Sequence, residues 1–68
     1  MARELKNRLK VLRAERDLTQ EELARRVGVT RKTINTVERG VFVPSTVLAL
    51  KLARDLGVPV EEVFQLDD

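Results

Sequence analysis

The chain has 68 residues, of which 43% are hydrophobic and 35% charged, with a formal net charge of +2 and neither cysteine nor histidine. This length predicts one small domain, and the missing residue types exclude disulfides, zinc fingers and thiol or imidazole catalysis. We therefore expect no metal site and no cofactor. Because no run of 18 apolar residues and no apolar signal segment is present, the sequence also predicts no membrane contact and a cytoplasmic location.

The charge is unevenly distributed along the chain. Residues 1–40 carry 11 Lys or Arg against 6 Asp or Glu, whereas residues 41–68 carry 2 against 5. A basic half is expected where a protein faces phosphates, so the distribution favours a nucleic-acid partner for the N-terminal half. A solvated surface of mixed charge would produce the same asymmetry, so the decision rests on motifs.

The first predicted helix runs from about residue 3 to residue 16, because Leu5, Leu9 and Leu12 recur at helical spacing. Two shorter helices are expected at about residues 20–27 and 31–39.

Two helix starts are recognisable between residues 19 and 40. Thr19 followed three residues later by Glu22 is a capping box, and Thr30 is placed to cap the next helix. Gly28, between them, can adopt the left-handed backbone conformation that ends a helix. Two short helices joined by a glycine-containing turn are typical of a helix-turn-helix, which we place at about residues 20–39.

The outer face of the helix at residues 31–39 carries side chains that can hydrogen-bond to base edges. In the major groove of DNA, Arg and Lys suit guanine, Asn suits adenine, and Thr suits a thymine methyl group. A merely solvated polar face would carry similar residues, but the helix-turn-helix pattern in front of it favours DNA. The predicted base-reading residues are Arg31, Lys32, Asn35 and Thr36.

Two further helices are predicted in the C-terminal part of the chain. Ser45 would cap a helix at residues 46–56, and a short helix at residues 60–65 would follow Pro59. No alternating apolar run bounded by turns predicts a strand.

The helix at residues 46–56 has more apolar side chains than one face can bury. An exposed apolar surface usually marks a protein contact, so we expect self-association through residues 45–66 and the loop before them. The predicted homodimer interface comprises Phe42, Val47, Leu50, Val60, Phe64 and Leu66.

At residues 12–40, LRAERDLTQEELARRVGVTRKTINTVERG resembles the Cro/repressor-type helix-turn-helix family, also called XRE-type regulators. The most specific matches within this segment are TQ-x-x-LA, VGVT, Ile34 and E-x-G. Residues 44–64 look like the two closing helices of small single-domain members. The resemblance implies an all-α fold, a compact five-helix bundle of the lambda-repressor-like type, forming one domain over residues 1–68.

The resemblance also implies double-stranded DNA as the partner, with the helix at residues 31–39 in the major groove. By position, Arg13 and Glu38 match an internal ion pair that orients this helix. Contacts that hold phosphates place the protein without reading sequence. The implied phosphate contacts are Gln20, Thr30, Thr33, Arg39, Ser45 and Thr46.

We therefore predict a sequence-specific, nucleoid-associated transcriptional regulator, a dimeric repressor that binds a near-palindromic operator. An antitoxin or protein-interaction adaptor with the same fold, acting on a protein partner, is the alternative. An enzyme is disfavoured. The paired carboxylates at residues 21–22 and 61–62 stand at helix starts, where acids stabilise the helix dipole, and neighbouring helical residues point in different directions.

Overall fold

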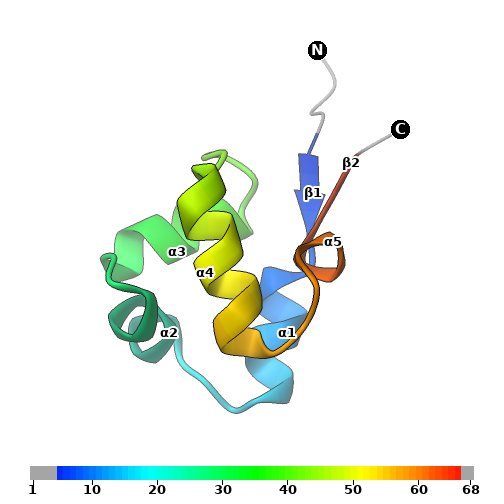
Figure 1. Cartoon of the computed structure of the whole chain (residues 1–68). Helices are drawn as coiled ribbons and strands as arrows, with labels where there is room; N and C mark the ends of the chain where they lie inside the picture. The colour runs from blue at the N-terminus through cyan, green and yellow to red at the C-terminus, as the bar shows by residue number, and fades with distance from the viewer. Residues whose placement is uncertain (1–4, 67–68) are drawn as a thin grey trace.

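Five helices and two short strands make up the computed structural model, which describes residues 5–66 (Figure 1). In chain order they are β1 (Leu5–Asn7), α1 (Leu9–Glu15), α2 (Gln20–Val27), α3 (Arg31–Glu38), α4 (Thr46–Leu56), α5 (Val60–Val63) and β2 (Phe64–Leu66). The predicted five-helix fold is confirmed. Helices α2 and α3 pack against each other, and α4 crosses the centre of the molecule and packs against α2 and α5.

One fully buried side chain from each helix meets in a common core. Leu9 of α1, Leu23 of α2, Ile34 of α3, Leu52 of α4 and Val63 of α5 all have no exposed surface. Burying an aliphatic side chain of this size stabilises the fold by about 1.5–3 kcal/mol. Because every helix contributes one such side chain, the position of α3 depends on all the others.

The predicted helix caps are present. The Thr19 hydroxyl accepts from the Glu22 N–H at 3.0 Å while the Glu22 carboxylate accepts from the Thr19 N–H at 2.8 Å. The Thr30 hydroxyl accepts from the Thr33 N–H, and the Ser45 hydroxyl accepts from the Leu48 N–H. These caps place α2 and α4 where the sequence predicts them, whereas α3 is one residue shorter and ends at Glu38.

Gly28 has the left-handed conformation expected of it, with a φ of 80°. It ends α2, and its N–H donates to the Ala24 carbonyl. Glycine adopts this conformation without steric cost, so Gly28 allows the chain to pass from α2 to α3 in a tight turn.

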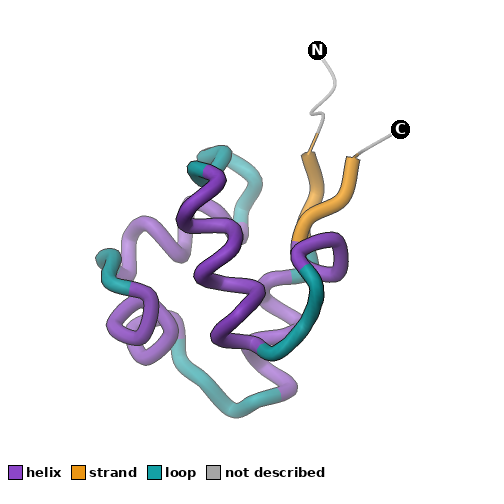
Figure 2. Tube along the Cα trace, viewed as in Figure 1, coloured by secondary structure: helices purple, strands orange, loops and turns teal. Residues whose placement is uncertain are grey.

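The prediction that no strand is present is wrong. Strands β1 and β2 pair antiparallel, with Leu5 opposite Leu66 and Asn7 opposite Phe64 (Figure 2). Helix α1 therefore begins at Leu9 rather than near residue 3, and α5 ends at Val63 rather than at residue 65. Residues 3 and 4 of the predicted first helix lie outside the described residues.

The physical reason is the length and separation of the two strands. Three residues are too few to show an alternating pattern, and the pairing partners lie at opposite ends of the described chain. The Asn7 side chain also favours a helix start at this place, because its Oδ1 accepts from the Leu9 N–H at 3.0 Å. Within residues 5–66, no helix is long and apolar enough to cross a membrane.

Candidate nucleic-acid interface

Helix α3 has a buried face and a polar outer face. Ile34 and Val37 are buried in the core. On the other side, Arg31 and Lys32 are exposed, and Asn35 and Thr36 are half-buried. The structure thus brings the four predicted base-reading residues onto one surface. Asn35 lies one helical turn after Arg31, and Thr36 one turn after Lys32.

An ion pair ties the end of α3 to α1. Arg13 Nε donates to Glu38 Oε2 at 2.7 Å, and Arg13 Nη1 donates to the Leu18 carbonyl at 2.8 Å. The Glu38 side chain is only 4% exposed and that of Arg13 15%. Burial removes water from both charges, so each depends on the other, and the pair holds α3 in one orientation.

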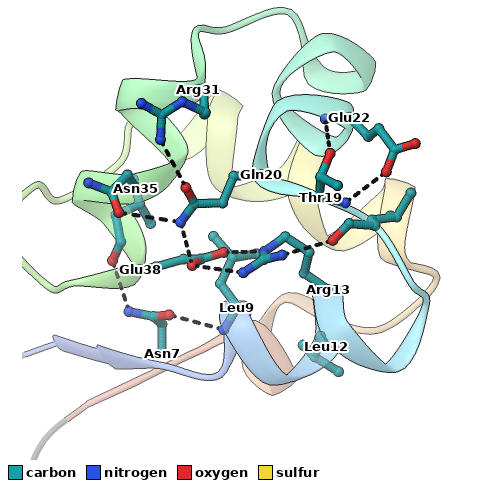
Figure 3. Close-up of polar contacts among 12 residues, drawn as sticks. Asn7, Leu9, Leu12, Arg13, Thr19, Gln20, Glu22, Arg31, Asn35 and Glu38 are labelled. Atoms are coloured by element: carbon teal, nitrogen blue, oxygen red, sulfur yellow. Dashed lines mark hydrogen bonds and ion pairs between the residues drawn. The ribbon is translucent and has the colours of Figure 1, made fainter.

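Gln20 extends this contact to the outer face of α3 (Figure 3). Its Nε2 donates to Glu38 Oε1 at 2.9 Å and to Asn35 Oδ1 at 3.3 Å. Its Oε1 accepts from Arg31 Nη1 at 3.4 Å. The first residue of α2 therefore braces two of the predicted base-reading side chains.

Asn7 was not predicted as part of the site. Its Nδ2 donates to the Val37 carbonyl at 3.0 Å, while its Oδ1 accepts from the Leu9 N–H. One side chain thus connects β1, the start of α1 and the end of α3 (Figure 3). An asparagine two residues before a helix start is a recognisable capping signal, but nothing local to it indicates the contact with α3.

Five of the predicted phosphate contacts cluster at helix N-terminal ends. Gln20 begins α2, Thr30 and Thr33 occupy the start of α3, and Ser45 and Thr46 the start of α4. Helix N-terminal ends favour anions, because their free N–H groups and dipoles point outward. The sixth, Arg39, follows the last residue of α3 and is exposed.

Most of the predicted dimer residues gather around two adjoining hollows. Leu5, Val43 and Phe64 line both hollows, and two of these three were not predicted. Val47 lines neither, although it is 63% exposed. We define the apolar face as Leu5, Phe42, Val43, Leu50, Val60, Phe64 and Leu66.

The apolar face lies next to the end of α3 rather than its start. One of its two hollows is also lined by Val37 and Gly40, which belong to the last turn of α3 and the turn after it. Within residues 5–66, no group of three or more carboxylates forms a candidate metal site.

A five-helix fold whose second and third helices form a helix-turn-helix, with cationic and amide side chains on the outer face of the third, defines a DNA-binding class of protein. Comparison with known proteins agrees. The helix-turn-helix family matches residues 9–63 of the chain. A helix-turn-helix-type transcriptional regulator of Methanocaldococcus jannaschii is 47% identical over 94% of this chain and 97% of its own.

Two further similarities are informative. A cryptic phage CTXphi transcriptional repressor from Vibrio cholerae is 40% identical over 84% of this chain and 51% of its own. The crystal structure of the restriction-modification controller protein C.AhdI from Aeromonas hydrophila superposes with a TM-score of 0.76 at 42% identity, covering 81% of this chain and 83% of that one. The chain belongs to the Cro/repressor-type (XRE-type) helix-turn-helix family: it is a DNA-binding transcriptional regulator, not an enzyme.

Proposed function

We propose that the protein acts as a homodimeric repressor that binds a near-palindromic operator in the cytoplasm, on nucleoid DNA. In this proposal, α3 of each copy enters the major groove. The bound dimer then blocks access of polymerase to a promoter. The observation that carries the proposal is that one chain has two distinct surfaces. A braced polar face on α3 suits base edges, and the apolar face beside the end of α3 suits a second copy.

The polar side chains divide into two roles in this proposal. Arg31, Lys32, Asn35 and Thr36 read bases, because they share the outer face of α3. The residues at the N-terminal ends of α2, α3 and α4, together with Arg39, hold phosphates on either side. Neutralisation of phosphates by the cationic side chains on this surface makes affinity fall steeply as salt rises.

The size of the molecule supports a two-fold arrangement. Its longest dimension is 32 Å. Two recognition helices in successive major grooves must lie about 34 Å apart. A chain whose longest extent is close to this spacing is of a size that lets two adjacent copies each place one α3 in a groove.

Selection of bound sequences from a random DNA pool at moderate salt tests the proposal. We expect enrichment of a two-fold symmetric motif with half-sites about one helical turn apart. Enrichment of a single asymmetric site would contradict the dimer. If no motif were enriched and binding vanished with salt, sequence-specific reading would be contradicted as well.

A second candidate function is that of an antitoxin or adaptor whose apolar face binds a different protein. The observation that favours it is the exposure of Phe42 (47%) and of Val41 and Val43 (67% and 69%) in one loop. Sedimentation of the pure protein separates the two. A stable dimer favours the repressor, whereas a monomer that still carries this exposed surface favours a different protein partner.

A further inference from the structure

We infer that Asn35 presents its amide N–H₂, and not its oxygen, to DNA and therefore prefers guanine, which offers two hydrogen-bond acceptors in the major groove, over adenine, which offers one acceptor beside a donor. The inference rests on the proposed docking of α3 in the major groove, and it deepens that proposal by assigning the base class read by one residue. It is carried by two hydrogen bonds of Gln20 Nε2, one to the nearly buried carboxylate of Glu38 and one to Asn35 Oδ1.

The Glu38 carboxylate determines which way the Gln20 amide faces. Glu38 is ion-paired with Arg13, and an ionised carboxylate can only accept hydrogen bonds. The Gln20 atom that lies 2.9 Å from Glu38 Oε1 must therefore be the nitrogen. The opposite orientation would place two acceptors together away from water, which is costly.

The other end of the Gln20 amide agrees with this orientation. With Nε2 facing Glu38, Oε1 faces Arg31 Nη1, a cationic donor, at 3.4 Å. Reversing the amide would replace this attraction by contact between an amide N–H₂ and a guanidinium, both of which only donate. Two independent neighbours of Gln20 thus require the same orientation.

Gln20 in turn determines the orientation of Asn35. The second hydrogen of Gln20 Nε2 points to Asn35 Oδ1 at 3.3 Å. Placing Asn35 Nδ2 there would again bring two donors together. Figure 3 shows the Asn35 oxygen turned toward Gln20 and its nitrogen on the side away from Gln20.

This orientation changes the base that Asn35 can read. Adenine offers an acceptor and a donor side by side in the major groove, and an asparagine binds it with both amide atoms. The Asn35 oxygen is turned toward Gln20, so the amide cannot lay its oxygen and nitrogen side by side against adenine. The outward N–H₂ can reach two acceptors on guanine but only one on adenine, where the neighbouring amine would face it as a second donor, so the N–H₂ favours guanine.

The experiment is selection from a random DNA pool with the unaltered protein and two variants. Asn35→Ala locates the base pair read by Asn35, because preference is lost there alone. We expect a G·C pair at that position for the unaltered protein. Gln20→Ala frees the Asn35 amide to rotate, so we expect the preference for adenine over guanine there to rise by about 5-fold or more. Gln65→Ala, which removes a similar side chain from β2, is the matched control.

Each outcome decides the inference. An A·T pair at the located position, or no position that responds to Asn35→Ala, would overturn it while the proposed function stands. No enriched motif for the unaltered protein would overturn both. If circular dichroism shows that Gln20→Ala does not fold, the base pair selected by the unaltered protein at the position located with Asn35→Ala still tests the inference. An unchanged preference in a folded Gln20→Ala variant would also overturn the inference.

Discussion

The outer face of α3 and the apolar face differ in how their side chains are supported within the single chain. On α3, side chains are braced by hydrogen bonds that lead back to Glu38, whose side chain is 4% exposed. On the apolar face, Leu50 and Leu66 are 54% and 70% exposed. The polar surface is complete within one chain, whereas the apolar surface leaves area that a second chain can cover. The outer-face side chains of α3 are therefore oriented within one chain, whereas in the proposed dimer the apolar face is where a second copy would add affinity.

The largest effect should come from breaking the internal support. Glu38→Ala leaves the Arg13 guanidinium, 15% exposed, without its carboxylate, and removes the acceptor that orients Gln20. We expect a loss of about 3 kcal/mol in the free energy of unfolding, measured by urea denaturation, and weaker DNA binding.

The control for Glu38→Ala is the exposed pair between Arg26 and Asp55. The Arg26 side chain is 53% exposed and that of Asp55 20%. Because water screens this pair, Asp55→Ala should cost less than about 1 kcal/mol. Equal losses for the two variants would show that the internal support has no special role.

The next effect should come from placing a charge on the apolar face. Leu50 is exposed in the single chain, so Leu50→Glu should leave the fold intact. In a dimer it would bring a carboxylate into an apolar contact, and we expect the dimer to dissociate about 30-fold more readily, or roughly 2 kcal/mol. Sedimentation equilibrium measures this change. An unaltered dimer would place the interface elsewhere.

A smaller and more local effect is expected from the outer face of α3. Arg31→Ala should cost about 1–3 kcal/mol at one base pair and relax the preference there. Arg39→Ala, after the end of α3, should weaken all sequences alike, because a phosphate contact reads no base. Competition binding with single-base operator variants separates the two. Equal weakening of every operator by Arg31→Ala would make Arg31 a phosphate contact.

The smallest effect concerns the capping box of α2. Hydrogen bonds from the Thr19 backbone and side chain lower the pKa of Glu22 below its ordinary value of 4.5. Because its pKa is lower in the folded state, the Glu22 carboxylate stabilises the fold at pH values above its pKa in the unfolded chain. This stabilisation is lost as the pH falls through the pKa of the folded state. Glu22→Gln keeps an acceptor but does not titrate. Between about pH 5 and pH 3 its unfolding free energy should therefore fall less than that of the unaltered protein. Identical pH profiles would contradict the role of this carboxylate.

The parts of the fold that sequence could predict are those determined by neighbouring residues. Thr19, Gly28, Thr30 and Ser45 act through residues within four positions, so α2 and α4 were predicted with their observed bounds. The pairing of β1 with β2 depends on residues at opposite ends of the chain and leaves no local pattern.

In the candidate site, too, features set by neighbouring residues could be predicted and contacts between distant residues could not. The outer face of α3 follows from helical spacing, but the contact between Arg13 and Glu38 spans 25 positions and came from family resemblance. Neither source indicates that Asn7 reaches the Val37 carbonyl or that Gln20 orients Asn35. These contacts depend on the packed arrangement of α1, α2 and α3.

The central proposal is that two copies read one symmetric operator together. The most direct measurement is binding of the protein to its selected operator and to a variant with about five base pairs inserted between the half-sites, which is about half a helical turn. A two-fold dimer held through the apolar face should bind the variant far more weakly, because its second α3 would then face away from its half-site. Equal affinity for the two operators would contradict the proposal, since each copy would then be reading its half-site independently.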